Sequence, residues 1–507
     1  MNVVDSYDYV VVGAGSSGCV IASRLSENSD CSVLLAEAGG TCVHPDVINP
    51  VRWTSLFPGP LDWGYLSQPM RHCHGRIDHV PRAKMLGGCH SHNAGVWVRG
   101  HRADFDGWEA AGCSGWGWND VLPIYQRIEN WQGAPNTLRG KNGPMYITPP
   151  QNPNPIAAAF AGSGSYARIP VNEDYNAESM DGTCFFNLTV RDGKRFSVVD
   201  AYLNPALGRD NLTVLTNVSV TGLVMNGTTC TGVRFLQDGK PRQIVCRREV
   251  ILSAGVIGSP QILMLSGIGP SAELQALGIP PVIDLPGVGR NLQDHVLVAG
   301  INYECRTPLP EPRNNGAEAT LWWYSRDGLD RPDIQPVILE FPFVTPDLAS
   351  RLTSQNCYAI APSIVQPRSR GSVRLASADP LAAPLIDVNF LADPSDVAAM
   401  LAAVELCRAI GASSAFDEFR SHELMPGNLS AGEMTDFIRR AATTYFHPTS
   451  TCSMGTGSDA VVSPQLQVHG IQNLRVADAS IMPDITCGNT NAPCVMIAER
   501  AVDLLRI

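Results

Sequence analysis

The chain begins with a pattern of apolar and glycine positions that predicts one β-α-β unit. Residues 8–12 (DYVVV) are almost continuously apolar, as in a strand buried within a parallel sheet. Glycines between residues 13 and 18 predict a tight turn, and residues 19–27 show the spacing of a helix. Residues 32–36 (SVLLA) predict a second buried strand. A strand, a helix and a second strand within about thirty residues are typical of this unit.

The pattern after residue 40 is less regular. A polar stretch rich in Pro and Trp covers residues 41–150, and mixed strand and helix signals follow it. Strand-like runs recur at 212–235, 249–254, 282–285 and 371–375, and helices are predicted at 395–410 and 493–505. No apolar run has the length that a membrane-spanning helix requires, and no internal repeat is visible.

Length and composition restrict the class of protein. A chain of 507 residues is longer than a single hydrophobic core usually supports, which predicts two domains or a split two-lobe fold. The formal net charge of −11 argues against a nucleic acid or an anionic membrane as partner. The 15 cysteines form no CxxC pair, so neither a zinc site nor any other metal site is predicted. The absence of an export signal favours the cytoplasm.

The glycine-rich turn has the features of a dinucleotide site. Residues 13–18 fit G-x-G-x-x-G, where the first glycine permits the turn and the second lets the backbone approach a pyrophosphate. The third glycine, Gly18, permits close packing of helix and strand. Glu37 lies 19 residues after Gly18, at the end of the second strand, where a carboxylate can bind an adenosine ribose. This motif alone does not separate NAD from FAD.

Several further segments resemble signature segments of one family, the glucose–methanol–choline (GMC) oxidoreductases. They occur along this chain in the same order as in the family. They are residues 82–93 (RAKMLGGCHSHN), 255–269 (GVIGSPQILMLSGIG), 287–295 (GVGRNLQDH), 446–448 (FHP), 476–480 (VADAS) and 489–493 (NTNAP). The resemblance extends from about residue 6 to the end of the chain.

The resemblance implies an α/β fold of two lobes, similar to that of p-hydroxybenzoate hydroxylase. A Rossmann-like FAD-binding domain is expected over residues 1–150, 190–298 and 436–507, and an antiparallel-sheet substrate domain over residues 151–189 and 299–435. The expected cofactor is FAD. The expected cofactor-binding residues are Gly13, Gly15, Ser16, Ser17, Gly18, Glu37, Ala38, Trp63, Gly88, Cys89, His92, Asn93, Ala94, Val220, Asp478 and Ala479.

Within the family, the chain looks most like the choline oxidases. Their flavin is covalently attached to a His that precedes Asn in the segment GGCSSHN. This chain reads GGCHSHN, so the resemblance places His92 at the attachment position, with His90 as a second candidate. A loop histidine that only contacts the flavin is the alternative interpretation.

The resemblance also implies a catalytic pair. His447 occupies the position of the family's histidine that precedes Pro, and a neutral imidazole can accept the hydroxyl proton of an alcohol. Asn491, 44 residues later, falls on the position of its partner and would orient the alcohol by hydrogen bonding. His469 is an ambiguous third candidate for contact with the flavin edge.

The substrate pocket differs from that of choline oxidases. Their cation-binding Glu, two residues after the Asp-His of LQDH, corresponds to Leu297, and a substrate-side His corresponds to Val337. The expected substrate-binding residues are Trp53, Leu297, Trp323, Phe343 and Phe446. Aromatic side chains can bind a cation or stack on a flat alcohol. A neutral aryl, furanic or aliphatic primary alcohol is favoured, and an amine-bearing or sugar-like alcohol recognised by Glu340 is the alternative.

Together, these features predict an FAD-dependent oxidase that converts a primary alcohol to an aldehyde. Hydride would pass to flavin N5, His447 would act as general base, and O₂ would reoxidise the flavin to give H₂O₂. A dehydrogenase that uses another electron acceptor and a non-redox lyase of the same family are the alternatives. The expected partners are the alcohol and O₂, and a homodimer is a candidate assembly.

Overall fold

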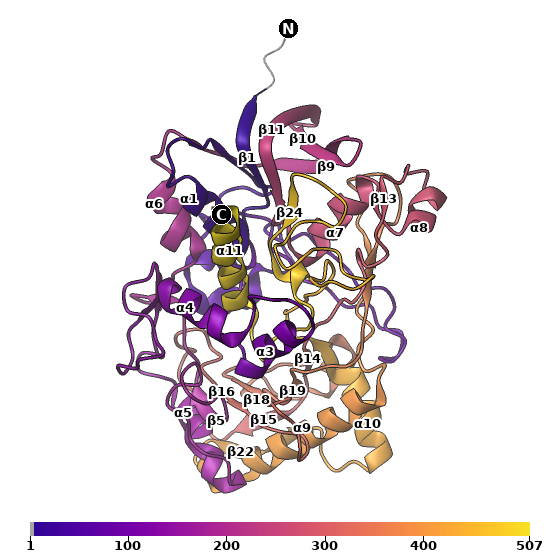
Figure 1. The fold of residues 1–507 in the computed structure, drawn as a ribbon. Helices are drawn as coiled ribbons and strands as arrows, with labels where there is room; N and C mark the ends of the chain where they lie inside the picture. The colour runs from indigo at the N-terminus through magenta and orange to yellow at the C-terminus, as the bar shows by residue number, and fades with distance from the viewer. Residues whose placement is uncertain (1–4, 507) are drawn as a thin grey trace.

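The structure is a computed structural model that describes residues 5–506 (Figure 1). Its first sheet has seven strands, in the order β8-β2-β1-β11-β10-β9 with β24 paired to β11. The pairs of β1 with β2 and β11, of β2 with β8 and of β11 with β24 are parallel, whereas β9, β10 and the start of β11 form an antiparallel meander. The strands are β1 Ser6–Val12, β2 Val33–Ala36, β8 Leu212–Leu215, β9 Val218–Asn226, β10 Thr229–Gln237, β11 Lys240–Leu252 and β24 Leu474–Val476.

The β-α-β unit predicted at the start of the chain is confirmed. Helix α1 (Ser16–Leu25) connects β1 to β2, and the C-terminal helix α11 (Asn491–Leu505) packs beside α1. Residues 9–12 of β1 are buried in the main hydrophobic cluster, as expected for a strand of a parallel sheet that is covered on both faces. A Cβ atom added to Gly18 would lie 1.8 Å from the carbonyl oxygen of Gly13, so only glycine lets α1 pack this closely on the turn.

The second sheet has six antiparallel strands, in the order β22-β15-β18-β17-β16-β5. It joins segments that are far apart in the sequence, because β5 from the first half of the chain pairs with β16. The strands are β5 Gly182–Phe185, β15 Asn302–Cys305, β16 Ala319–Trp322, β17 Val337–Leu339, β18 Cys357–Ala361 and β22 Arg420–Met425.

Figure 1 shows the two sheets at opposite ends of the molecule, with α9 (Pro394–Ala412) and α10 (Ala431–Ala441) beside the second. The antiparallel architecture expected for the second lobe is therefore observed. The exact division of the chain into domain segments remains a prediction. Among the described residues, the helices are too short or too polar to cross a membrane.

A small three-stranded sheet, β19-β14-β23, brings the signature segment 287–295 next to the signature segment 446–448, and its edge strand β19 is Ser363–Ile364. Strand β14 (Val296–Val298) pairs antiparallel with β23 (Ala442–Thr444), with Val296 opposite Thr444. His295 therefore lies next to the residues that follow β23, and the Tyr445 amide donates to its carbonyl oxygen at 2.9 Å.

Candidate active site

A cavity of about 540 Å³ extends from the glycine-rich turn to the residues that follow β23. Its walls come from the first sheet, from the loop after η2 (Gly88–Ser91), and from β14 and β17. Nearly all the residues predicted to bind cofactor lie on these walls. Those lining it are Gly13, Gly15, Ser16, Ser17, Glu37, Ala38, Trp63, Gly88, Cys89, His92, Asn93, Ala94, Val220, Asp478 and Ala479. Gly18 is the exception, because it packs behind the turn.

The dinucleotide end of the cavity is built from backbone groups. The amides of Ala14 and Gly39 each donate to a different oxygen of Glu37 at 2.8 Å, which fixes this carboxylate at the end of β2. The N-terminus of α1 faces the same space and can bind a phosphate through its free N–H groups. A Cβ atom on Gly88 would lie 2.7 Å from the Gly15 Cα, so the two glycine loops form a narrow cradle that side chains would fill.

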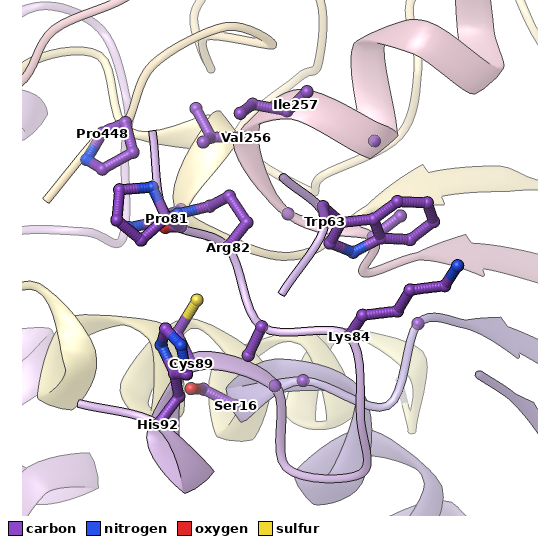
Figure 2. A pocket seen from close by; sticks show the side chains of 18 of the residues that line it. Ser16, Trp63, Pro81, Arg82, Lys84, Cys89, His92, Val256, Ile257 and Pro448 are labelled. Carbon is purple, nitrogen blue, oxygen red and sulfur yellow. Dashed lines mark hydrogen bonds between the residues drawn. The ribbon is translucent and has the colours of Figure 1, made fainter. Parts of the chain in front are cut away.

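The long walls of the cavity are lined by two groups of side chains. Figure 2 shows Cys89 and His92 beside Ser16 on one side, and Trp63 with Lys84 on the other. The Lys84 ammonium lies 4.6 Å from the centre of the Trp63 ring. Arg82 also lines the cavity, and its guanidinium donates to the Phe446 carbonyl oxygen at 2.9 Å, next to His447. The glycine cradle, the fixed carboxylate of Glu37 and the N-terminus of α1 all fit bound FAD.

His447 is held in one tautomer by a chain of hydrogen bonds. His295 Nε2 lies 3.1 Å from the Thr486 carbonyl oxygen, which can only accept, so Nε2 of this histidine carries the proton. Burial lowers the pKa of His295 to about 3, so its ring is neutral and Nδ1 is an acceptor. His447 Nδ1 lies 2.9 Å from this atom and must donate to it.

This polarity leaves the lone pair of His447 on Nε2. Burial, His295 and Arg82 hold the pKa of His447 well below its usual value, so the ring is neutral. The backbone amide of His447 donates to Asp294 Oδ1 at 2.9 Å, which anchors the loop. His447 lines the cavity, and its unprotonated Nε2 is therefore the atom suited to accept a proton from a bound molecule.

The structure corrects the predicted partner of this histidine. Asn489 Nδ2, not a group of Asn491, lies 3.0 Å from His447 Nε2. The side chain of Asn491 instead accepts from the Ser16 hydroxyl at 2.9 Å, beside the glycine-rich turn. Both asparagines line the cavity, but Asn491 begins helix α11 and is thereby directed to the dinucleotide end. The two asparagines are only two residues apart. Because the conformation of this loop cannot be predicted from the sequence, the sequence does not show which of the two side chains points to His447.

The other candidate histidines occupy different environments. His92 lines the cavity, and its Nε2 is buried without a hydrogen-bond partner, 3.8 Å from Asp62 Oδ2. His90 does not line the cavity, because its two ring nitrogens contact Thr189 and the amide of Val198. His469 contacts the Gly455 carbonyl oxygen away from the cavity, so the structure gives it no place at the flavin edge.

The end of the cavity near His447 is apolar and aromatic. The ring of Phe57 contacts the rings of both His92 and Phe446, with ring centres 4.9 Å and 5.5 Å apart, respectively. Predicted residues that line the cavity are Trp53, Leu297, Val337, Phe343 and Phe446.

Trp323 does not line the cavity, contrary to prediction. Neighbouring side chains on a strand point to opposite faces. Trp322 packs in the cluster that contains Leu297, whereas Trp323 packs against the cluster around α9 on the other side. The sequence shows that Trp322 and Trp323 are adjacent. Which of the two side chains points toward the cavity depends on the strand register, which the sequence does not give.

Glu340 is also absent from the cavity wall. Its Oε2 accepts from Asn154 Nδ2 at 2.9 Å and from the Arg313 amide at 3.1 Å. Burial and the nearby Glu318 raise the pKa of Glu340 to about 9, so this carboxyl is uncharged at neutral pH. Both its position and its charge argue against recognition of an amine by this residue.

Comparisons with known proteins agree with this site. GMC oxidoreductase family models match residues 7–297 and residues 367–498. An oxygen-dependent choline dehydrogenase of Brucella suis is 39% identical, with 98% of this chain and 95% of that protein covered. An alcohol dehydrogenase (acceptor) of Pseudomonas putida is 36% identical, with coverage of 98% and 95%. The crystal structure of pyridoxine 4-oxidase from Mesorbium loti is 36% identical, with a TM-score of 0.95 and 98% of both chains covered.

The chain therefore belongs to the GMC oxidoreductases, which are FAD-dependent enzymes that act on CH–OH groups.

The neutral state of His447 generates a prediction for the pH dependence of flavin reduction. A base with a depressed pKa is unprotonated at every pH above that value, so the reaction slows only when the pH falls through it. We expect the second-order rate constant for anaerobic flavin reduction by benzyl alcohol to stay flat above pH 6.5, the ordinary pKa of histidine. An ascending limb centred above that pH would contradict the geometry.

Proposed function

We propose that this protein is an alcohol oxidase that converts a primary alcohol to an aldehyde and reduces O₂ to H₂O₂. The observation that carries the proposal is the unprotonated Nε2 of His447, which faces the cavity and is held in that state through His295 and Thr486. Bound FAD would accept the hydride from the alcohol carbon.

The protein's own residues account for the proton. An alcohol oxygen near His447 Nε2 would replace Asn489 as its hydrogen-bond donor and pass its proton to the ring. The freed amide of Asn489 could then donate to the developing alkoxide. The Asn489 Oδ1 accepts from Gln335 Nε2 at 3.0 Å, which fixes which end of the amide faces His447. Its geometry therefore suits the orienting role that we first assigned to Asn491.

Removal of the base gives the first test of this proposal. His447→Ala should retain bound FAD, because its contacts are remote from the dinucleotide turn, and should lose anaerobic flavin reduction by about 10²–10⁴-fold. Rapid mixing with benzyl alcohol measures the rate. His469→Ala is the matched control, since His469 lies outside the cavity, and it should reduce at the normal rate. Normal reduction in the His447 variant would exclude this histidine as the base.

The charge distribution favours a neutral substrate. The carboxylates that line the cavity are Glu37 and Asp478. Glu37 accepts two backbone amides, and Asp478 accepts from the Gly255 amide and the Ser259 hydroxyl. Both are committed to the dinucleotide end, while Leu297, 2% exposed, occupies the His447 end. A quaternary ammonium would lose its hydration there without a charged partner, so we propose a flat, neutral aryl or furanic alcohol.

A single substitution tests this preference. Leu297→Glu places a carboxylate on the apolar wall, which should weaken benzyl alcohol turnover at least tenfold in kcat/KM and allow slow choline oxidation. The conservative variant Leu297→Met is the control and should retain the preference for benzyl alcohol. If wild-type protein oxidises choline faster than benzyl alcohol, the neutral-substrate proposal is wrong.

The names of similar proteins bear on the choice of electron acceptor. Two of the similar proteins are named as oxygen-using enzymes, the oxygen-dependent choline dehydrogenase and pyridoxine 4-oxidase, which favours O₂. The similar alcohol dehydrogenase is named for another acceptor, so a dehydrogenase is the second candidate.

We further propose that FAD is covalently attached to His92. The attachment would replace a C–H bond of the flavin 8α-methyl group by a C–N bond to the imidazole, and the two electrons released would reduce the flavin ring, which O₂ would reoxidise. Burial, Arg82 and Arg195 lower the pKa of His92 to about 3, so the ring is a neutral nucleophile at the cavity wall. Acid precipitation of the purified protein should leave yellow flavin in the pellet. The pellet of His92→Ala should be colourless, whereas His90→Gln, altered outside the cavity, should remain yellow. A colourless wild-type pellet would contradict the attachment.

A further inference from the structure

Arg195 is a buried cation without an acidic partner. Its side chain is 7% exposed, and among residues 5–506 no carboxylate lies within salt-bridge distance of it. The guanidinium donates from Nε to the Val47 carbonyl oxygen at 2.8 Å and from one NH₂ group to the backbone and side-chain oxygens of Asn93. Its other NH₂ group is buried with no partner.

Such an arrangement is costly for the free protein. A buried charge loses hydration, and neutral carbonyl groups compensate only part of that loss. The cost appears in the pKa of Arg195, which burial lowers to about 10, although the charge of Asp200 acts in the opposite direction. Other buried arginines of this protein have carboxylates in direct contact, as Arg99 and Arg139 have in Glu129. Because no carboxylate contacts Arg195, its guanidinium can stabilise negative charge on a group bound in the cavity.

The cation lies directly behind the cavity wall at the catalytic end. Asn93, which it holds, lines the cavity together with His92 and Ala94. The ring of Phe57 contacts those of both His92 and Phe446, so this wall adjoins the region of His447. The positive charge of Arg195 also disfavours protonation of His92.

We infer that Arg195 is a positioning residue that raises the reduction potential of the bound flavin. Two-electron reduction places negative charge on the flavin ring, and a nearby buried cation stabilises that charge strongly because the surroundings screen it poorly. Reduced flavin would bring negative charge to a guanidinium that no carboxylate contacts. The same guanidinium fixes Asn93, so it combines an electrostatic and a structural effect on one wall of the site.

The inference is tested by potentiometry of the holoprotein with a reference dye, without any alcohol. Arg195→Gln keeps a donor for the carbonyl groups but removes the charge, whereas Arg195→Lys keeps the charge. We expect the glutamine variant to disfavour the two-electron reduction at least tenfold, a fall of about 30 mV in midpoint potential. The lysine variant should stay close to wild type. Arg195→Met, which fills the same buried space, replaces the glutamine variant if that protein does not fold.

A matched control variant distinguishes the effect of removing a charge near the cavity from the effect of removing an arginine elsewhere in the protein. Arg209 also donates to a backbone carbonyl and a hydroxyl, of Ser23 and Ser26, but neither of these serines lines the cavity, so Arg209→Gln should leave the potential unchanged. An unchanged potential in the Arg195→Gln variant overturns the inference, as does an equal fall in the lysine variant. Because no alcohol is present, failure of the proposed alcohol oxidation would not affect this measurement.

Discussion

The contact between the Thr486 carbonyl oxygen and His295 sets the polarity on which the proposed chemistry depends. A carbonyl oxygen has no proton to give, so His295 must donate to it and accept from His447. The second histidine then has its lone pair on the nitrogen that faces the cavity. Burial of both rings keeps them neutral. A base is thus prepared by one backbone oxygen that touches neither cofactor nor substrate.

The fold serves this arrangement by joining distant parts of the chain. Pairing of β14 with β23 brings the histidine before one strand next to the histidine after the other. The loop before α11 supplies Thr486 and Asn489, and the helix itself then packs on α1 beside the glycine-rich turn. The loop that contacts both histidines thus leads directly into the helix that packs at the dinucleotide end.

Much of this could be predicted from the sequence. The β-α-β unit and Glu37 can be predicted because they belong to a local motif with a defined spacing, whereas His447 follows from the resemblance of segment 446–448 to the GMC family. Asn489 was missed in favour of Asn491, since only the start of α11 decides which one faces His447. Trp323 was misplaced because strand register was unknown. His295 lay within a recognised segment, but its role depends on a contact 152 residues away, which no local pattern reveals.

We propose that this site removes a proton and a hydride from a neutral alcohol and that the reduced flavin then passes its electrons to O₂. Mixing the holoprotein with benzyl alcohol without air, while following the visible absorbance of the flavin, tests this proposal. We expect bleaching, slower bleaching when deuterium replaces hydrogen at the alcohol carbon, and recovery of the colour with formation of H₂O₂ when air is admitted. Flavin that stays oxidised with aryl, furanic and aliphatic alcohols alike would contradict it, and bleaching that only a dye or quinone reverses would exclude the oxidase.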